Sequence, residues 1–232
     1  MASTREPQYQ SCIELAAQRG RACFGVMSNE VWHNDPRRLA FVLARYKFVA
    51  KMFSGMGSVL EVGCADAFAT RIVLQEVDRV TAVDFDPLFI EDVKARMDPA
   101  WPIDCRVHDM LAGTVDGEFD GAYAIDVLEH IPVAKEDVFL GNIVASLKSH
   151  GVLIVGIPSL QSQAYASPPS RAGHVNCKDA AGLKATLSRF FQNVFIFSMN
   201  DEVVHTGFSA MAHYLFALAC SPRLRPCTSA SQ

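Results

Sequence analysis

Residues 59–67 read Val59-Leu60-Glu61-Val62-Gly63-Cys64-Ala65-Asp66-Ala67, a short apolar run that ends in a turn of small residues. A second apolar run, Val80-Thr81-Ala82-Val83-Asp84, ends in a carboxylate 21 positions after Gly63. This layout is typical of the nucleoside-binding half of an α/β protein. In such a half, the first strand leads into a tight turn at the ligand, and the second ends in an acid that accepts the ribose hydroxyls. We therefore predict a nucleoside site on two parallel strands.

The turn itself indicates which nucleoside binds. A dinucleotide site needs glycines where the pyrophosphate touches the backbone, but only Gly63 is a glycine here and Phe68 stands at the third glycine position. A ligand without phosphates, such as S-adenosylmethionine, asks less of this turn. Glu61 and Asp66 can supply negative potential near its sulfonium. We expect S-adenosylmethionine rather than the nicotinamide nucleotide of a dehydrogenase.

Length and composition predict one ordinary globular protein. The chain has 232 residues, half of them apolar and a fifth charged, with a net charge of −4 that gives no general attraction to nucleic acid. The sequence holds no run of about 20 apolar residues and begins with a polar segment, so we expect no membrane span and a cytoplasmic location. Seven cysteines without a C-x-x-C motif are expected to be reduced thiols.

Strand and helix patterns alternate along the chain, which predicts an α/β fold with a mostly parallel sheet covered on both faces. Residues 1–54 are expected to form N-terminal capping helices, residues 55–220 the core, and residues 221–232 a disordered tail. Residues 210–220 fit a strand or a helix, and we choose a strand. The expected helices are 8–20, 36–53, 67–76, 87–97, 134–148 and 178–188, and the seven expected strands are 58–62, 79–84, 103–107, 119–125, 152–157, 191–198 and 210–220.

Four segments together resemble the class I, or Rossmann-like, S-adenosylmethionine-dependent methyltransferases. They are Val59–Ala67, Val80–Asp84, Val107–Met110 and Tyr123–Pro132, and Gly151–Val155 looks like the fifth strand of that family. The run Asp126-Val127-Leu128-Glu129-His130 is the most specific, and it is typical of the small-molecule branch that includes ubiquinone-pathway O-methyltransferases. The resemblance is strong over about residues 55–160. It implies a Rossmann-like seven-stranded sheet with N-terminal capping helices.

The resemblance also implies roles for residues at the carboxyl ends of the strands. Gly63 and Ala65 would approach the methionine part of the cofactor, and Asp126 would lie near its amino group and the methyl to be transferred. The remaining expected contacts are Asp84 with the ribose, Phe85 with the adenine ring, Asp109 and the Met110 backbone with the adenine amino group, and Arg45 with the carboxylate. Arg37, Arg38 and Lys47 are rivals of Arg45 for that last role.

Histidines are the natural bases for methylation of a hydroxyl. His174, in the long loop of residues 158–177, is the first candidate, and His130 after the fourth strand is the second. Tyr165, Arg171 and His205 are candidate acceptor contacts. We expect no metal, because Asp126 and Glu129 are available but no Asp-Asn pair follows in the region of the fifth strand.

These features predict methyl transfer from S-adenosylmethionine, with S-adenosylhomocysteine as product, to a small or medium acceptor. The expected reaction is O-methylation of a sugar, a quinone precursor or another metabolite, by a monomer or homodimer. N-methylation of a small amine or amino sugar, and a non-catalytic cofactor-binding protein, are the alternatives. The acidic charge and the short chain argue against RNA or protein as the acceptor.

Overall fold

The computed structural model describes residues 3–223. Within this range the helices are α1 (Gln10–Arg19), α2 (Val26–Asn34), α3 (Pro36–Met52), α4 (Thr70–Val73), α5 (Pro87–Arg96), α6 (Glu136–Ala145), α7 (Pro168–Gly173) and α8 (Ala180–Ser188). The strands are β1 (Ser58–Val62), β2 (Arg79–Asp84), β3 (Asp104–Val107), β4 (Phe119–Ile125), β5 (Leu147–Pro158), β6 (Phe191–Asn200), β7 (Val203–His205) and β8 (Tyr214–Pro222).

All the strands lie in one sheet, in the order β3-β2-β1-β4-β5-β8-β6-β7. Neighbours from β3 to β5 are parallel, whereas β8 is antiparallel to both β5 and β6. The predicted α/β class is confirmed, and the ambiguous segment 210–220 lies mostly in a strand, β8, as chosen. The count of seven needs correction to eight, because β7 adds a three-residue edge strand that pairs with β6. A segment that short carries no recognisable periodicity.

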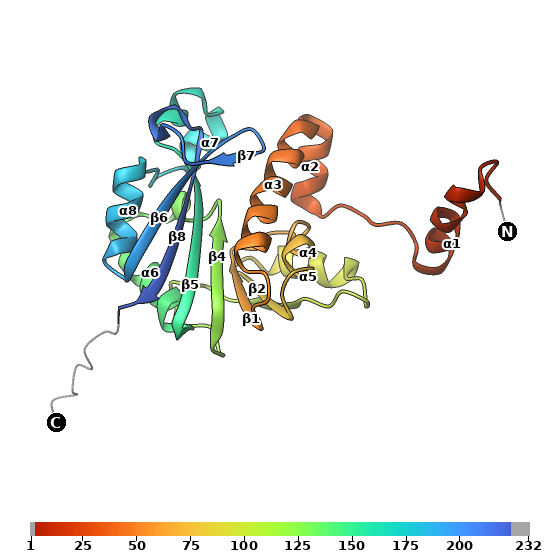
Figure 1. The fold of residues 1–232 in the computed structure, drawn as a ribbon, viewed down its shortest axis with the longest axis horizontal. Helices are drawn as coiled ribbons and strands as arrows, with labels where there is room; N and C mark the ends of the chain where they lie inside the picture. The colour runs from red at the N-terminus through yellow and green to blue at the C-terminus, as the bar shows by residue number, and fades with distance from the viewer. Residues whose placement is uncertain (1–2, 224–232) are drawn as a thin grey trace.

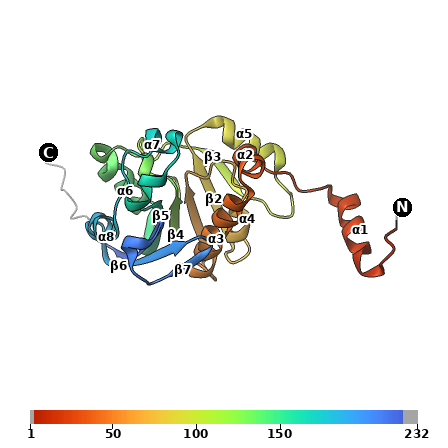
Figure 2. The same cartoon turned by 90° about the horizontal axis from the view of Figure 1, so that it is seen from above.

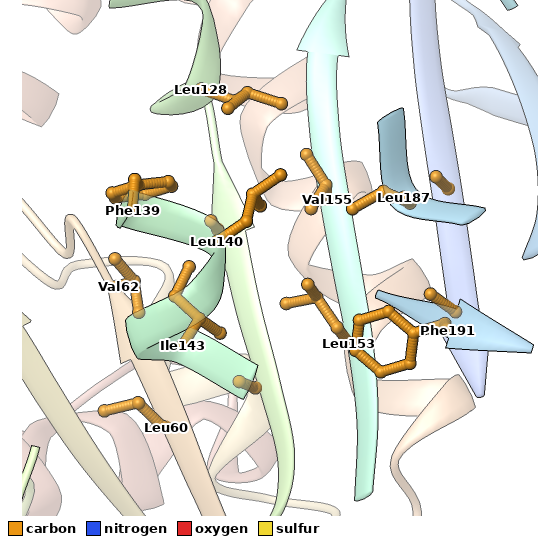
Figure 3. Packing of buried hydrophobic residues seen from close by; sticks show 14 of the residues in the cluster. Leu60, Val62, Leu128, Phe139, Leu140, Ile143, Leu153, Val155, Leu187 and Phe191 are labelled. Carbon is orange, nitrogen blue, oxygen red and sulfur yellow. The ribbon is translucent and has the colours of Figure 1, made fainter. Parts of the chain in front are cut away.

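Alternate residues of the strands pack on opposite faces of the sheet, so helices cover both (Figures 1 and 2). On one face, Leu60, Leu153 and Val155 pack against Leu140 and Ile143 of α6 and against α8 (Figure 3). The other face packs against α3, α4 and α5. Because β1 to β5 are parallel, their carboxyl ends lie along the same edge of the sheet, which is where ligands bind in such folds.

Of the three N-terminal helices, α2 and α3 are held against the rest of the protein, whereas α1 is not. The carboxylate of Asp66, in the turn after β1, accepts hydrogen bonds from the Ser28 backbone N–H at 2.7 Å and from its hydroxyl at 3.2 Å, and so caps α2. Gly25 permits this approach, since a Cβ there would lie 2.4 Å from the Asp66 Cβ. By contrast, α1 has no buried residue and stands away from the sheet (Figure 1).

Some element boundaries differ from the expected ones. The helix expected at 67–76 is shorter than predicted and consists of α4 alone. Because Ala65 and Ala67 take left-handed backbone angles, the turn after β1 extends further before the helix begins. No pattern in residues 26–34 predicts α2, and β5 begins at Leu147, inside the helix expected at 134–148. Of the expected tail, Ser221 and Pro222 belong to β8 and residues 224–232 lie outside the described range. Among the described helices, none has the length and apolarity to cross a bilayer.

Candidate active site

The turn after β1 is fixed by the acid that ends β2. Gly63 has a φ of +72°, and a Cβ at this position would lie 2.5 Å from a methyl group of Val127, so only glycine fits. The buried carboxylate of Asp84 accepts hydrogen bonds from the backbone N–H of Ala65 at 2.9 Å and of Asp86 at 3.0 Å. Asp84 thus shapes the turn, and its contact with a ribose stays a prediction.

Glu61 lies in the sheet beneath this turn and is only 1% exposed. Its carboxylate accepts hydrogen bonds from the hydroxyls of Tyr46 at 2.7 Å, Tyr123 at 2.8 Å and Thr70 at 2.5 Å. Burial raises the pKa of Glu61 to about 7, although the three hydroxyls favour the ionised form. In this structure Glu61 therefore joins α3, α4 and β4, and its expected effect on a sulfonium is untested.

The expected adenine contacts lie at the ends of β2 and β3. The ends are adjacent, because the backbone N–H of His108 donates to the Asp84 carbonyl at 2.8 Å. Phe85 is 74% exposed, and Asp109 is exposed with its carboxylate accepting from the Leu111 N–H at 2.8 Å. Met110 is buried, and its carbonyl accepts from the Asn142 side chain at 2.7 Å. Phe85 follows Asp84 directly and is exposed, and its packing on the adenine ring stays a prediction.

Arg45 meets Asp126 at the carboxyl end of β4. Its guanidinium forms an ion pair with the Asp126 carboxylate and lies 3.9 Å from the centroid of the Tyr214 ring. Burial disfavours the charge of Arg45, but Asp126, Tyr214 and Glu129 together favour it, and the Arg45 pKa lies above its usual value. Asp126 has a φ of +59°, which is uncommon for a residue other than glycine. Among the rivals of Arg45, the exposed Arg37 pairs with Asp35 instead.

Among residues 3–223, three buried side-chain atoms in this region have no hydrogen-bond partner. They are Nε of Arg45, one carboxylate oxygen of Glu129 and the hydroxyl of Tyr214. Leaving a buried polar atom unpaired costs about 1–3 kcal/mol, so such atoms indicate a missing partner. A cationic donor, a carboxylate and a hydroxyl together suit a ligand that carries both a carboxylate and an ammonium group. The residues present therefore fit the amino-acid end of S-adenosylmethionine.

The two predicted histidines lie together, with ring centroids 5.1 Å apart. The Nδ1 of His130 lies 3.0 Å from the Gly173 carbonyl, and the Nδ1 of His174 lies 2.9 Å from the amide oxygen of Gln163. Because both partners only accept, each Nδ1 must donate in the neutral ring, which leaves Nε2 of both histidines with a free lone pair. Burial, followed by the neighbouring His130, lowers the pKa of His174 and favours its neutral form.

Glu129 completes this cluster. One ligand atom from each of Glu129, His130 and His174 lies within 4.8 Å of those of the other two, a spacing that could hold a divalent cation. Burial, followed by the charge of Asp126, raises the pKa of Glu129 well above its usual value. The expectation of no metal counted Glu129 but looked for an Asp-Asn pair near the fifth strand, whereas the possible partners of Glu129 in this structure are the histidines His130 and His174.

The predicted acceptor contacts have other partners in this structure. The guanidinium of Arg171 donates to the carbonyls of Ala166 at 2.8 Å and Ala164 at 3.5 Å. His205 bonds through Nε2 to the Asn200 side chain and accepts from the Gly207 N–H through Nδ1, both at 2.9 Å. Tyr165 is 90% exposed. The first two residues therefore stabilise their own loops, and contact of all three with an acceptor stays a prediction.

The sequence predicts no role in the site for Tyr214 or Gln163, and it indicates Glu129 only as an available metal ligand. A wider role for Glu129 could have been inferred from its place in the Asp126–His130 run, three positions after the strand-end acid. Tyr214 and Gln163 carry no local signal, because their roles depend on contacts with Arg45 and His174 across the fold.

Comparisons with known proteins concern the domain and its fold. Residues 60–155 match the family described as "Methyltransferase domain". A ubiquinone biosynthesis O-methyltransferase of Xanthomonas campestris pv. campestris is 28% identical over 116 residues, and the match covers 47% of this chain and 48% of that protein. This chain therefore spans about half the length of the curated relatives that it matches.

Solved methyltransferase structures share the fold. The N-methyltransferase NodS from Bradyrhizobium japonicum, solved with S-adenosylhomocysteine, has a TM-score of 0.60 and 22% identity, covering 83% of this chain and 91% of that one. A TehB-like S-adenosylmethionine-dependent methyltransferase from Corynebacterium glutamicum has a TM-score of 0.59 and 16% identity, covering 93% of this chain and 96% of that one. The fold of this chain is thus the class I methyltransferase fold.

Proposed function

We propose that this chain, which carries a methyltransferase domain with the class I fold, is an S-adenosylmethionine-dependent O-methyltransferase. The acceptor is a hydroxyl of a small or medium molecule, such as a sugar, a quinone precursor or another metabolite, and S-adenosylhomocysteine is released. The observation that carries the proposal is the pair of histidines beside the buried Glu129, each of which has its Nδ1 held by a hydrogen bond.

Each side chain of the site has a separate role in methyl transfer, which is an in-line displacement. When bound, S-adenosylmethionine supplies the electrophilic methyl group. Arg45 holds the carboxylate of the cofactor, while Asp126 and Glu129 accept from its ammonium group. Asp84 accepts from the ribose hydroxyls. His174, supported by His130, would take the proton of the acceptor hydroxyl on Nε2.

A second use of the same cluster also has an observation behind it. If Glu129, His130 and His174 hold a divalent cation, the acceptor oxygen is activated by coordination rather than by a histidine base. Both versions lead to O-methylation. They differ in whether chelation removes the activity.

The first test is calorimetry with S-adenosylmethionine and S-adenosylhomocysteine on the wild type and on Asp84→Ala. We expect micromolar binding that the substitution weakens at least about tenfold, or roughly 1.4 kcal/mol. A folded protein that binds neither compound would contradict the proposal.

The second test is an acceptor panel of hydroxyl and amine compounds, followed by mass spectrometry. We expect methylated hydroxyl compounds, with strong loss in His174→Ala and His130→Ala. His150→Ala is the matched control, because His150 is 72% exposed and lies beside Asp120. Chelator treatment with Mg²⁺, Mn²⁺ or Zn²⁺ added back separates metal activation from a histidine base. Methylated amines with unaffected histidine variants would favour N-methylation instead.

A further inference from the structure

His174 has a side-chain partner that lies outside the cluster itself. Gln163, in the 3-10 helix Gln161–Tyr165, places its amide oxygen 2.9 Å from Nδ1 of His174. Both residues belong to the loop after β5, but they are separated by 11 positions and by the helix α7. The contact therefore depends on how this loop folds back on itself.

The orientation of the Gln163 amide is fixed from its other side. Its NH₂ group lies 3.4 Å from the Ser159 carbonyl and 3.4 Å from the Ser162 hydroxyl, so the amide oxygen is the atom left for His174. Ser159 is fully buried and is itself held, because its hydroxyl donates to the Ala212 carbonyl at 2.7 Å. A chain of hydrogen bonds thus runs from the segment before β8 through Ser159 and Gln163 to His174.

The backbone around His174 is held independently of Gln163. The N–H of His174 donates to the Ser170 carbonyl at 2.8 Å, and the N–H groups of Val175 and Asn176 donate to the Glu129 carbonyl. The contribution of Gln163 is therefore to determine which nitrogen of the imidazole ring carries the proton. An amide oxygen can only accept, so it selects the tautomer with the proton on Nδ1 and the lone pair on Nε2.

We propose that Gln163 is a positioning residue that holds His174 in the Nδ1–H tautomer, with Nε2 free for the acceptor. This inference rests on the proposed function of the cluster, and it applies to His174 as a base and as a metal ligand. In either role Nε2 must offer a lone pair, and a ring with its proton on Nε2 offers none at that atom. Gln163 touches neither the acceptor nor the cofactor in this scheme.

The test compares Gln163→Leu, which removes the acceptor atom, with Gln163→Glu, which keeps an acceptor oxygen. Gln161→Leu is the matched control, because Gln161 is an exposed glutamine of the same helix. We expect Gln163→Leu to lower kcat by about tenfold or more, the usual effect of losing such a supporting hydrogen bond, with the cofactor KM within about twofold. Gln163→Glu should recover most of kcat, and Gln161→Leu should match the wild type.

A spectroscopic measurement separates this role from simple loosening of the loop. In ¹⁵N-labelled protein, long-range ¹H–¹⁵N spectra identify the protonated ring nitrogen of His174. We expect the Nδ1–H tautomer in the wild type and in Gln163→Glu, and a shift toward Nε2–H in Gln163→Leu. An Nε2–H tautomer in the wild type, or an unchanged tautomer and kcat in Gln163→Leu, would overturn the inference. Because the tautomer is measured without turnover, it remains testable even if no acceptor is methylated and the proposed function fails.

Discussion

At the scale of single residues, Glu61 shows how burial and hydrogen bonding oppose each other. Burial raises its pKa from 4.5 to about 7. The folded protein therefore holds this proton more tightly than the unfolded chain, and the stabilisation is complete below about pH 4.5. It is lost as the pH rises through 7.

This difference predicts a pH-dependent stability gap between the wild type and Glu61→Gln. Between pH 4.5 and 8, the free energy of unfolding of the wild type should fall relative to the variant by roughly 3 kcal/mol, the value of the pKa change. Urea unfolding of both proteins across this range measures the difference between their free energies of unfolding. Other titrating groups contribute equally to both proteins and drop out of this difference. A gap that stays constant with pH would refute this account.

Arg45 supports a second prediction, because its charge and its shape can be separated. Arg45→Lys keeps the charge but loses the planar group that pairs with Asp126 and stacks on Tyr214. We expect binding of S-adenosylmethionine to weaken about tenfold, or roughly 1.4 kcal/mol, in calorimetry. Arg37→Lys, on an exposed residue of the same helix, should bind as the wild type does. Equal affinities of Arg45→Lys and wild type would show that charge alone suffices.

The choice of Arg45 also shows what sequence can and cannot predict about the site. Its basic character and its helix before β1 made it one candidate among four. Only the contact with Asp126, 81 positions away, separates it from Arg37, Arg38 and Lys47. Strand-end residues such as Gly63 and Asp84 were placed more easily, because strand, turn and second strand are local patterns. Residues that join distant segments, such as Tyr214, leave no such pattern.

At the scale of elements, the parallel strands and most of the helices that cover them were predictable, whereas α2 was not. Buried strands produce apolar runs that can be recognised one at a time, whereas α2 is stabilised by a residue outside its own sequence. Its only buried residues are Ser28 and Val31, and its cap is supplied by Asp66 from the turn after β1. The sequence of residues 26–34 alone therefore does not predict a helix.

The cap predicts a local effect of Asp66→Ala. Loss of the acceptor for the Ser28 N–H should destabilise the seating of α2 by about 1 kcal/mol, and its amides should exchange with solvent roughly fivefold faster. Asp86→Ala is the matched control, because Asp86 caps α5 through the Leu88 N–H. That variant should leave α2 exchange unchanged. Hydrogen exchange followed by mass spectrometry over residues 26–34 tests both, and equal exchange in Asp66→Ala and wild type would contradict the cap.

At the scale of the whole molecule, the N-terminal segment is the part least integrated with the rest. The apolar clusters join the sheet to α3, α4 and α5 on one face and to α6 and α8 on the other. No residue of α1 is buried, and its ion pair with the body, between Arg19 and Asp98, is exposed on both sides. Such exposed pairs contribute about 0–1 kcal/mol.

We therefore predict that removal of residues 1–20 hardly changes the stability of the protein. Loss of about 1 kcal/mol or less should lower Tm by no more than about 4 °C in a chain of this length. Removal of residues 1–34 is the informative comparison, because it also deletes α2 and its bonds to Asp66, and it should lower Tm further. Calorimetry at several protein concentrations measures both. A large, concentration-dependent loss on removing residues 1–20 would contradict the prediction and would mean that a second copy of the chain holds α1.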